Sequence, residues 1–136
     1  MFNVTINLLA VGVSALLSYV MSFVWFVLIF RTPYTEGLGK TAEEMAKGPS
    51  MLTASLLQLA GNLIMAYILA WLMARTGMMT IGQGMLLATL VWTGFVAAVL
   101  GPMYAFQAFS LSFFLITAGS VLVSLLIMGA IIGIWR

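Results

Sequence analysis

Long apolar segments alternate with short polar ones along the whole chain. Four of these segments, at about 7–30, 51–74, 81–100 and 110–135, are near or above the ~20 residues that a helix needs to cross a bilayer. Strands are not expected, because their open edges would leave backbone groups unpaired in hydrocarbon. The pattern therefore predicts an all-α fold: an antiparallel bundle of four transmembrane helices with short loops, forming a single membrane domain over residues 1–136.

Polar residues in the first loop have the spacing of helix caps. In the segment 31–50, Thr41 and Glu44 match a capping box, which predicts a short helix lying at the membrane interface. Ser50 is placed to cap the second span. This loop is therefore expected to be an ordered interfacial segment.

Glycine, proline and threonine mark the other boundaries. Gly77 is placed to end the second span, and Thr80 and Gln83 repeat the capping-box spacing at the start of the third. Gly101 and Pro102 are expected to end the third span. Because these connections are short, successive helices are expected to be antiparallel neighbours.

Small and polar residues recur at every fourth position within the spans. Ser14, Ser18 and Ser22 share one face of the first helix, and small residues in lipid let another helix approach closely. The simplest interpretation is helix packing, with Gly129 and Gly133 as a G-x-x-x-G contact. The other stripes are Ala54, Gln58, Asn62, Ala66, Ala70 and Ala74 in the second span, Thr89, Thr93, Ala97 and Gly101 in the third, and Ser120 and Ser124 in the fourth.

Several polar side chains share a level near the middle of the bilayer. Asn62 lies about 16 Å from the start of its helix at 1.5 Å per residue, and an amide facing lipid would lose its hydrogen bonds. A mid-membrane polar cluster is therefore predicted. It either holds the helices together by hydrogen bonds or lines a solute-binding cavity. Its expected members are Ser18, Tyr19, Gln58, Asn62, Trp92, Thr93 and Ser120.

Composition supports a membrane protein and narrows its chemistry. Hydrophobic residues make up 64% of the 136 residues and charged residues only 6%, so a water-soluble core could not hide the apolar surface. The formal net charge of +2 is too small for a nucleic-acid patch, so the expected partner is the lipid bilayer. Cysteine and histidine are absent, and no metal site or cofactor is expected. The four segments hold no charged residue, which argues against proton coupling and against catalysis.

Basic and aromatic residues at the segment ends bear on orientation and assembly. We call the face that holds the N-terminus side A and the face that holds the first loop side B. Three basic residues on side B against two on side A give a weak bias toward a cytoplasmic side B. A homo-oligomer is expected, joined through the Gly129 and Gly133 face, with another membrane protein as the alternative partner. The anchors are Trp25, Arg31, Tyr34 and Tyr104 on side B, and Trp71, Arg75, Trp135 and Arg136 on side A; Lys40 and Lys47 complete the basic count of side B.

Short motifs in three spans and in the first loop form a pattern shared with a known family. They are Ser22, Trp25, Phe26 and Phe30; Leu38, Gly39, Thr41, Glu43 and Glu44; Gly84, Trp92, Gly94 and Phe95; and Met128 with Gly129. In these motifs, and over nearly its whole length, the chain resembles the bacterial membrane proteins grouped as domain of unknown function 1761. The resemblance implies four spans and an uncharacterised role. The expected location is the inner (cytoplasmic) membrane of the cell.

The chain departs from that family at three places. The family often has Asn-Trp near the start, where this chain has Asn7 and Leu8, and an Asn with a nearby His in the fourth helix, where this chain has Thr117 and Val121. An activity carried by that Asn and His would be missing here. The preferred hypothesis is a non-enzymatic structural, accessory or interaction unit. The alternative is a small-solute transporter or channel with a polar cavity around Asn62.

Overall fold

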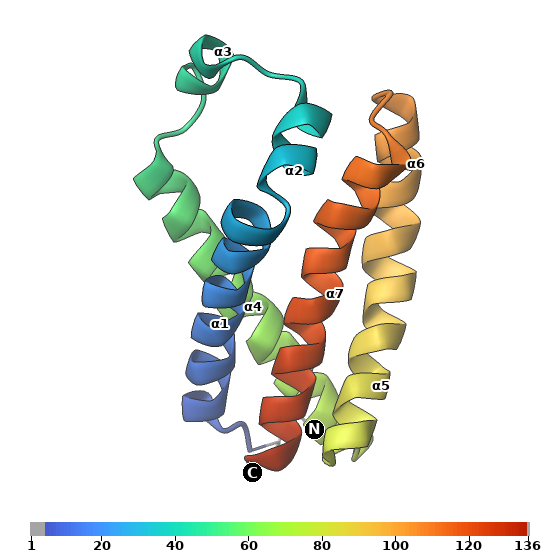
Figure 1. Cartoon of the computed structure of the whole chain (residues 1–136). Coiled ribbons are helices and arrows are strands. Elements are labelled where there is room, and N and C mark those ends of the chain that lie inside the picture. The colour runs from blue at the N-terminus through green and yellow to red at the C-terminus, as the bar shows by residue number, and fades with distance from the viewer. Residues whose placement is uncertain (1–4, 136) are drawn as a thin grey trace.

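The computed structural model describes residues 5–135, which form four long helical spans of alternating direction (Figure 1). Each span is long and apolar enough to cross a membrane. The predicted all-α fold with four membrane-spanning helices is therefore confirmed, and the chain is a multi-pass membrane protein. The expected anchor Arg136 lies outside the described residues. The elements in chain order are α1 (Leu8–Phe23), the π-helix η1 (Val24–Ile29), α2 (Arg31–Leu38), α3 (Ala42–Ala46), α4 (Met51–Thr76), α5 (Ile81–Val91), the π-helix η2 (Trp92–Ala97), α6 (Ala98–Phe106) and α7 (Leu111–Ile134).

Side-chain caps begin the helices where the sequence predicted them. At α3 the Glu44 N–H donates to the Thr41 hydroxyl at 3.1 Å, and the Thr41 N–H donates to the Glu44 carboxylate at 3.2 Å, which completes the capping box. At α4 the Thr53 N–H donates to the Ser50 hydroxyl at 3.2 Å. Gly77 ends α4 with a φ of 76°, a left-handed conformation that costs glycine little.

The third span ends later than the sequence predicted. The expected end at Gly101 and Pro102 is wrong, because α6 continues to Phe106 with Pro102 inside it. A proline removes one backbone donor, and neighbouring helices make such a loss tolerable in a membrane bundle. The wider π-helical turn of η2 lies directly before α6 and already changes the regular hydrogen-bond spacing there. The chain reverses after Phe106, where Ala108 has a positive φ of 61°.

Helix α7 occupies the centre of the bundle. It packs against α1, α4 and α5, while α2 and α6 contact it as well. Figure 1 shows α4 crossing behind α1 and α7, so that its N-terminal half lies apart from α6. Helices α4 and α5 share few contacts, and α5 packs mainly on α7. Successive helices are therefore in contact here too, as expected, but α5 has its main partner in α7.

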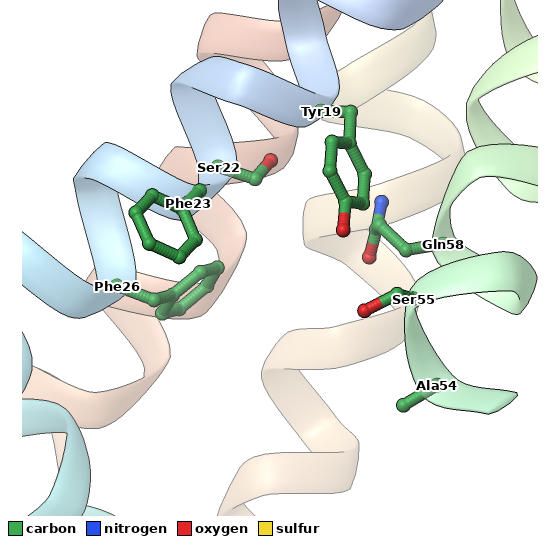
Figure 2. A pocket seen from close by; sticks show the side chains of 7 residues that line it. All are labelled: Tyr19, Ser22, Phe23, Phe26, Ala54, Ser55 and Gln58. Carbon is green, nitrogen blue, oxygen red and sulfur yellow. The ribbon is translucent and has the colours of Figure 1, made fainter. Parts of the chain in front are cut away.

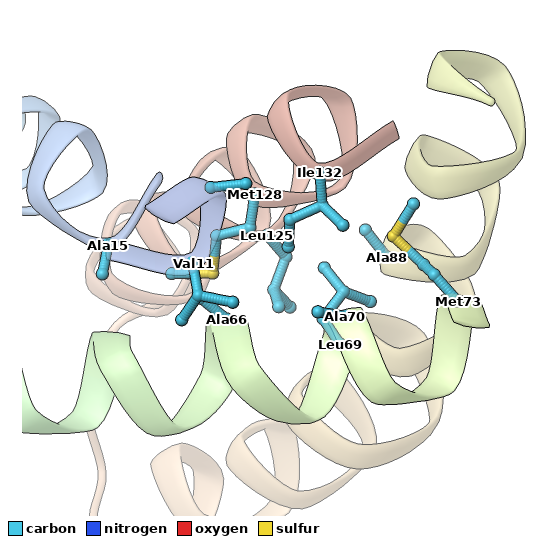
Figure 3. Close-up of a cluster of buried hydrophobic side chains, with 11 residues drawn as sticks. Val11, Ala15, Ala66, Leu69, Ala70, Met73, Ala88, Leu125, Met128 and Ile132 are labelled. Atoms are coloured by element: carbon cyan, nitrogen blue, oxygen red, sulfur yellow. The ribbon is translucent and has the colours of Figure 1, made fainter. Parts of the chain in front are cut away.

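Small side chains and methionines fill the buried core between α1, α4, α5 and α7 (Figure 3). Met73 and Met128 are fully buried, and flexible methionine side chains fill irregular gaps between helices well. Close packing has a larger share in the stability of a membrane bundle than of a soluble one, because lipid tails are as apolar as the core itself. The other buried apolar members are Ala10, Val11, Ala15, Ala66, Leu69, Ala70, Ala88, Leu125 and Ile132.

Glycines bring the backbones of α5 and α7 into contact. A Cβ at Gly84 would collide with the Gly129 carbonyl oxygen and would lie 2.7 Å from the methyl group of Met73. A Cβ at Gly133 would meet the Thr80 carbonyl carbon at 2.7 Å. The face formed by Gly129 and Gly133 is therefore buried within the chain. The expectation that this face joins subunits is wrong, because α5 already covers it.

The threonine stripe of the third span faces outward, contrary to the prediction. Thr89 and Thr93 are exposed, whereas Gly84 and Ala88 are buried against the core. The helix therefore turns the face that carries Gly84 and Ala88 toward the bundle, and the face that carries the threonines away from it. Each threonine hydroxyl is satisfied by its own helix: Thr89 donates to the Met85 carbonyl at 2.9 Å, and Thr93 donates to the Thr89 carbonyl at 2.8 Å. A hydroxyl that bonds in this way can face lipid without losing a hydrogen bond.

Candidate functional site: a polar cleft between α4, α6 and α7

Asn62 is the buried polar centre of the bundle. Its side chain is 0% exposed, and its Nδ2 donates to the Ala15 carbonyl oxygen at 3.3 Å. Its Oδ1 accepts from Gln58 Nε2, one helical turn earlier, at 2.9 Å. Gln58 is itself exposed, so the hydrogen-bonded pair of Asn62 and Gln58 extends from the buried contact between α1 and α4 to the surface of the bundle. A carboxamide has two N–H donors and an acceptor oxygen with two lone pairs, so part of its capacity stays open.

The serine stripe of α1 faces α4 and α7. Ser14 and Ser18 are fully buried and Ser22 is half-buried, so the helix turns its small face toward the bundle. The Ser18 hydroxyl donates to the Ser124 carbonyl of α7 at 3.3 Å, while Ser14 bonds within its own helix. The hydroxyl of Ser22 has no hydrogen bond among the described residues. Ser22 thus lies where the buried stripe gives way to open space.

That open space is a cleft of about 240 Å³ between α1, η1, α4, α6 and α7. Its wall combines hydroxyl and carboxamide groups with apolar side chains, and none of the charged residues that the structure describes lines it. The lining residues are Ser22, Phe26, Gln58, Asn62, Met65, Leu100, Tyr104, Thr117, Ser120, Val121 and Ser124. The cleft can therefore offer hydrogen bonds to an uncharged group but no counter-ion to a charged one.

Helix α7 contributes a row of three hydroxyls to the cleft wall. Thr117 donates to the Phe113 carbonyl at 2.9 Å, and Ser120 donates to the Thr117 carbonyl at 2.8 Å. Ser124 differs from both, because its hydroxyl makes no hydrogen bond among the described residues although the residue is only 3% exposed. This hydroxyl is not sealed inside the protein, since the described chain has no fully buried side-chain polar atom without a partner. Ser124 therefore presents an unpaired hydroxyl to the cleft.

Two further hollows adjoin the cleft and share Gln58 with it. One, of about 190 Å³, lies between α1, η1 and the start of α4 (Figure 2). In Figure 2 the Tyr19 phenol and the Gln58 carboxamide point into this hollow, with Ser22 nearby. The other, of about 420 Å³, lies along α4 and includes Asn62 and Val121. Gln58 thus stands at the meeting point of all three spaces.

Two tryptophans hold the middle of α7 from either side. Trp25 in η1 donates its indole N–H to the Ile116 carbonyl at 2.9 Å, and Trp92 in η2 donates to the Ala118 carbonyl at 2.8 Å. Both donors lie in π-helical turns, a geometry that is frequent at functional sites. These bonds fix the segment of α7 from which Thr117 and Ser120 project.

Aromatic rings cover the side-B end of the cleft, where η1, α2, α6 and α7 meet. The Tyr34 ring lies 4.7 Å from that of Phe26 and stacks on that of Phe113 at 5.5 Å, and Tyr104 lies 5.4 Å from Phe113. Gly37 allows this contact, because a Cβ there would lie 2.7 Å from the Phe113 ring. Burial raises the pKa of the Tyr34 phenol above its usual 10.0, and Tyr104 adds to the rise. Tyr34 therefore stays neutral at physiological pH.

The structure brings only part of the predicted polar cluster together. Gln58, Asn62 and Ser120 line the cleft, and Tyr19 lines the neighbouring hollow. Ser18 is buried between α1 and α7. Trp92 bonds to α7, and Thr93 is exposed on its own helix, so these two residues do not reach Asn62.

Sequence reasoning missed several residues of the cleft wall. Ser124 was assigned only to a packing stripe, Tyr104 only to an interfacial anchor, and Thr117 was noted only as a departure from the family pattern. The spacing of Thr117, Ser120 and Ser124, three and then four residues apart, is the signal that places them on one face of α7. The contribution of Tyr104 depends on α6 continuing past Pro102, which the sequence did not indicate.

The fold and the site together define a class: helical multi-pass membrane proteins with an uncharged polar cleft inside the bundle. The profile of the family described as "Protein of unknown function (DUF1761)" matches residues 9–133. The chain belongs to this family, which confirms the resemblance found in its motifs. Comparison with curated proteins and with solved structures gives no match.

Proposed function

We propose that this protein is a non-enzymatic membrane protein that binds a small uncharged molecule in the cleft beside Asn62, as a transporter or channel does. The observation that carries the proposal is the open hydrogen-bonding capacity of Asn62, Gln58 and Ser124 within one cleft. If the polar groups served only to hold the helices together, their hydrogen bonds would be used up among themselves. Here the Ser124 hydroxyl is unpaired among the described residues, and Gln58 keeps one N–H and its carbonyl oxygen free, beside a space of about 240 Å³.

The chemistry of the lining supports binding without catalysis. A membrane enzyme needs a nucleophile with a base beside it or a metal-ligand set. The cleft wall consists of hydroxyl, carboxamide and apolar side chains, and it contains no carboxylate or amine. A charged solute would lie there without a counter-ion, at a large cost in hydrocarbon surroundings. A bacterial cytoplasmic membrane is the location that the helical spans favour.

The test is the thermal unfolding of the purified protein in detergent micelles, followed by circular dichroism. Two uncharged probes, glycerol and 1-octanol, are compared with the charged probe octanoate. A ligand that binds the folded state raises the unfolding midpoint, so at least one uncharged probe is expected to raise it by a few degrees and octanoate is not. Asn62→Leu should abolish this shift because it removes the carboxamide from the cleft.

Two further variants keep the result interpretable. Gln58→Leu removes the partner of Asn62 from an exposed position, so it should fold even if Asn62→Leu does not, and it should weaken the shift. Thr93→Val removes an exposed hydroxyl outside the cleft and should respond as the original protein does. The proposal fails if neither uncharged probe raises the midpoint, or if Gln58→Leu responds like Thr93→Val.

A second candidate is an accessory or interaction unit, in which a helix of another membrane protein or of a second copy covers the cleft. The observation that favours it is the N-terminal half of α4, which lies apart from α6. Met51, Leu52 and Leu57 on this segment are 83%, 70% and 64% exposed. Lipid covers such a surface equally well, so the two candidates differ in what occupies the cleft.

A further inference from the structure

We infer that the molecule bound in the cleft is an uncharged lipid-like amphiphile that enters from the bilayer between α4 and α6. Its hydroxyl or carbonyl end would lie at Ser124 and Gln58, beside the buried Asn62, and its hydrocarbon chain would leave past Met65 and Leu100. This inference rests on the proposed function and specifies the class of ligand and its route. Three features of the cleft support this inference: the hydrogen-bonding groups at its polar end, the apolar side chains where α4 and α6 separate, and the side chains that obstruct it toward both membrane surfaces.

The polar end suits a small neutral group that both donates and accepts hydrogen bonds. The Ser124 hydroxyl is unpaired in a residue that is only 3% exposed, and it can donate one hydrogen bond and accept others. Asn62 is 0% exposed and already bonded to Ala15 and Gln58, so the second group that a ligand can reach is the exposed Gln58, which keeps one N–H and its carbonyl oxygen free. An alcohol or ester carbonyl satisfies such a pair of groups. A permanently charged headgroup does not, because no residue of opposite charge lines the cleft.

The apolar side of the cleft lies where α4 and α6 separate. Met65 on α4, Leu100 on α6 and Val121 on α7 line this part of the cleft. Helices α4 and α6 share at most isolated contacts, and Figure 1 shows that they diverge toward side B. A hydrocarbon chain can therefore lie between the two helices and continue into the surrounding lipid.

Both ends of the cleft along the membrane normal are obstructed. Toward side A, Ala66 and Met128 are fully buried in the core just beyond Asn62. Toward side B, the rings of Phe26 and Tyr104 line the cleft, and Tyr34 and Phe113 pack behind them. A water-soluble molecule would have to pass one of these barriers, whereas an amphiphile already in the bilayer would not.

The test is photocrosslinking with a hexadecanol analogue that carries a diazirine in its chain and an alkyne at its end. The full chain is reconstituted in phosphatidylcholine vesicles, labelled from the bilayer, and the modified positions are mapped by mass spectrometry. Labels are expected near Met65, Leu100 and Val121. Ser124→Ala should lower this labelling about fivefold, the effect of losing one net hydrogen bond to a neutral group, and the control Thr93→Val should leave it unchanged.

A matched charged probe separates specific binding from lipid contact. The corresponding alkyl sulfonate carries a permanent negative charge, so it should label the cleft residues much less than the alcohol does. The inference is overturned if the alcohol labels all lipid-facing positions alike, if Ser124→Ala has no effect, or if the sulfonate labels the cleft equally. If glycerol stabilises the protein through Asn62 while the alcohol fails to label the cleft, the proposed function stands and the lipid-like ligand is wrong. If both experiments fail, both proposals fall.

Discussion

Gly84 shows how a single residue can determine a helix contact. A Cβ at this position would collide with the Gly129 carbonyl of α7, so the two backbones touch only because both residues lack side chains. The nearby Gly82 lies on the same helix, and a Cβ added there would have nothing within 4 Å. The same residue type therefore has a packing role at one position and none two residues away.

Gly84→Ala is expected to destabilise the folded protein by roughly 1–3 kcal/mol, because the added methyl group forces α5 away from α7. The measurement is reversible unfolding in mixed micelles with increasing sodium dodecyl sulfate. The matched control Gly82→Ala should be neutral or slightly stabilising, since alanine favours a helix at an open position. Equal effects of the two substitutions would contradict the backbone contact.

At the scale of the element, local capping decides where helices begin, while tertiary context decides whether they continue. The capping box of Thr41 and Glu44 and the Ser50 cap involve neighbours along the chain, and the structure confirms them where they were expected. Pro102 was expected to end a helix by the same kind of local rule. In this bundle α6 continues through Pro102. The π-helical turn of η2 before it has already changed the hydrogen-bond spacing, and α7 packs beside it.

Thr41→Ala should loosen α3 without affecting the spans. Losing the cap costs about 1 kcal/mol of helix stability, which corresponds to roughly fivefold faster amide exchange over Ala42–Ala46. Hydrogen–deuterium exchange with mass spectrometry measures this rate. Thr32→Ala in α2 removes an exposed threonine hydroxyl that makes no hydrogen bond among the described residues, and it is the control. Unchanged exchange in Thr41→Ala would show that the capping box does not hold α3.

At the scale of the whole molecule, the steep crossing of α4 creates the cleft. The C-terminal half of α4 packs in the core through Ala66, Ala70 and Met73, while its N-terminal half separates from α6. If the axis of α4 were aligned with those of the other three spans, close-packed side chains would have filled the same space. The cleft is therefore a property of how the helices are arranged, and it belongs to no single segment.

The proposed function predicts that this face of α4 is covered by lipid or ligand and not by a second copy. Because the chain has no cysteine, a single Leu57→Cys substitution reports contacts between copies after oxidation. We expect no more disulfide-linked dimer than from Leu86→Cys, an exposed control position on α5. Gel electrophoresis without reductant measures the dimer. A clear excess from Leu57→Cys would favour the interaction unit instead.

The four spans, their helical character and most of their boundaries follow from the sequence by itself. The thickness of the bilayer and the need to pair every backbone group inside it act on each segment separately. Caps such as Thr41 and Ser50 act over three or four residues, so they too can be read locally. The uncharged interior also follows, because no charged residue occurs in the predicted spans.

Only the tertiary structure decided which faces meet and which polar groups stay open. A four-residue stripe marks a helix face, but the crossing angle and register of the partner decide whether that face is buried. This is why Gly84 is buried while Thr93 is exposed, and why Gly129 contacts α5. Asn62 and Ser124 lie far apart in the sequence on different helices, and their shared cleft arises from the way α4 crosses α7, which no local pattern encodes.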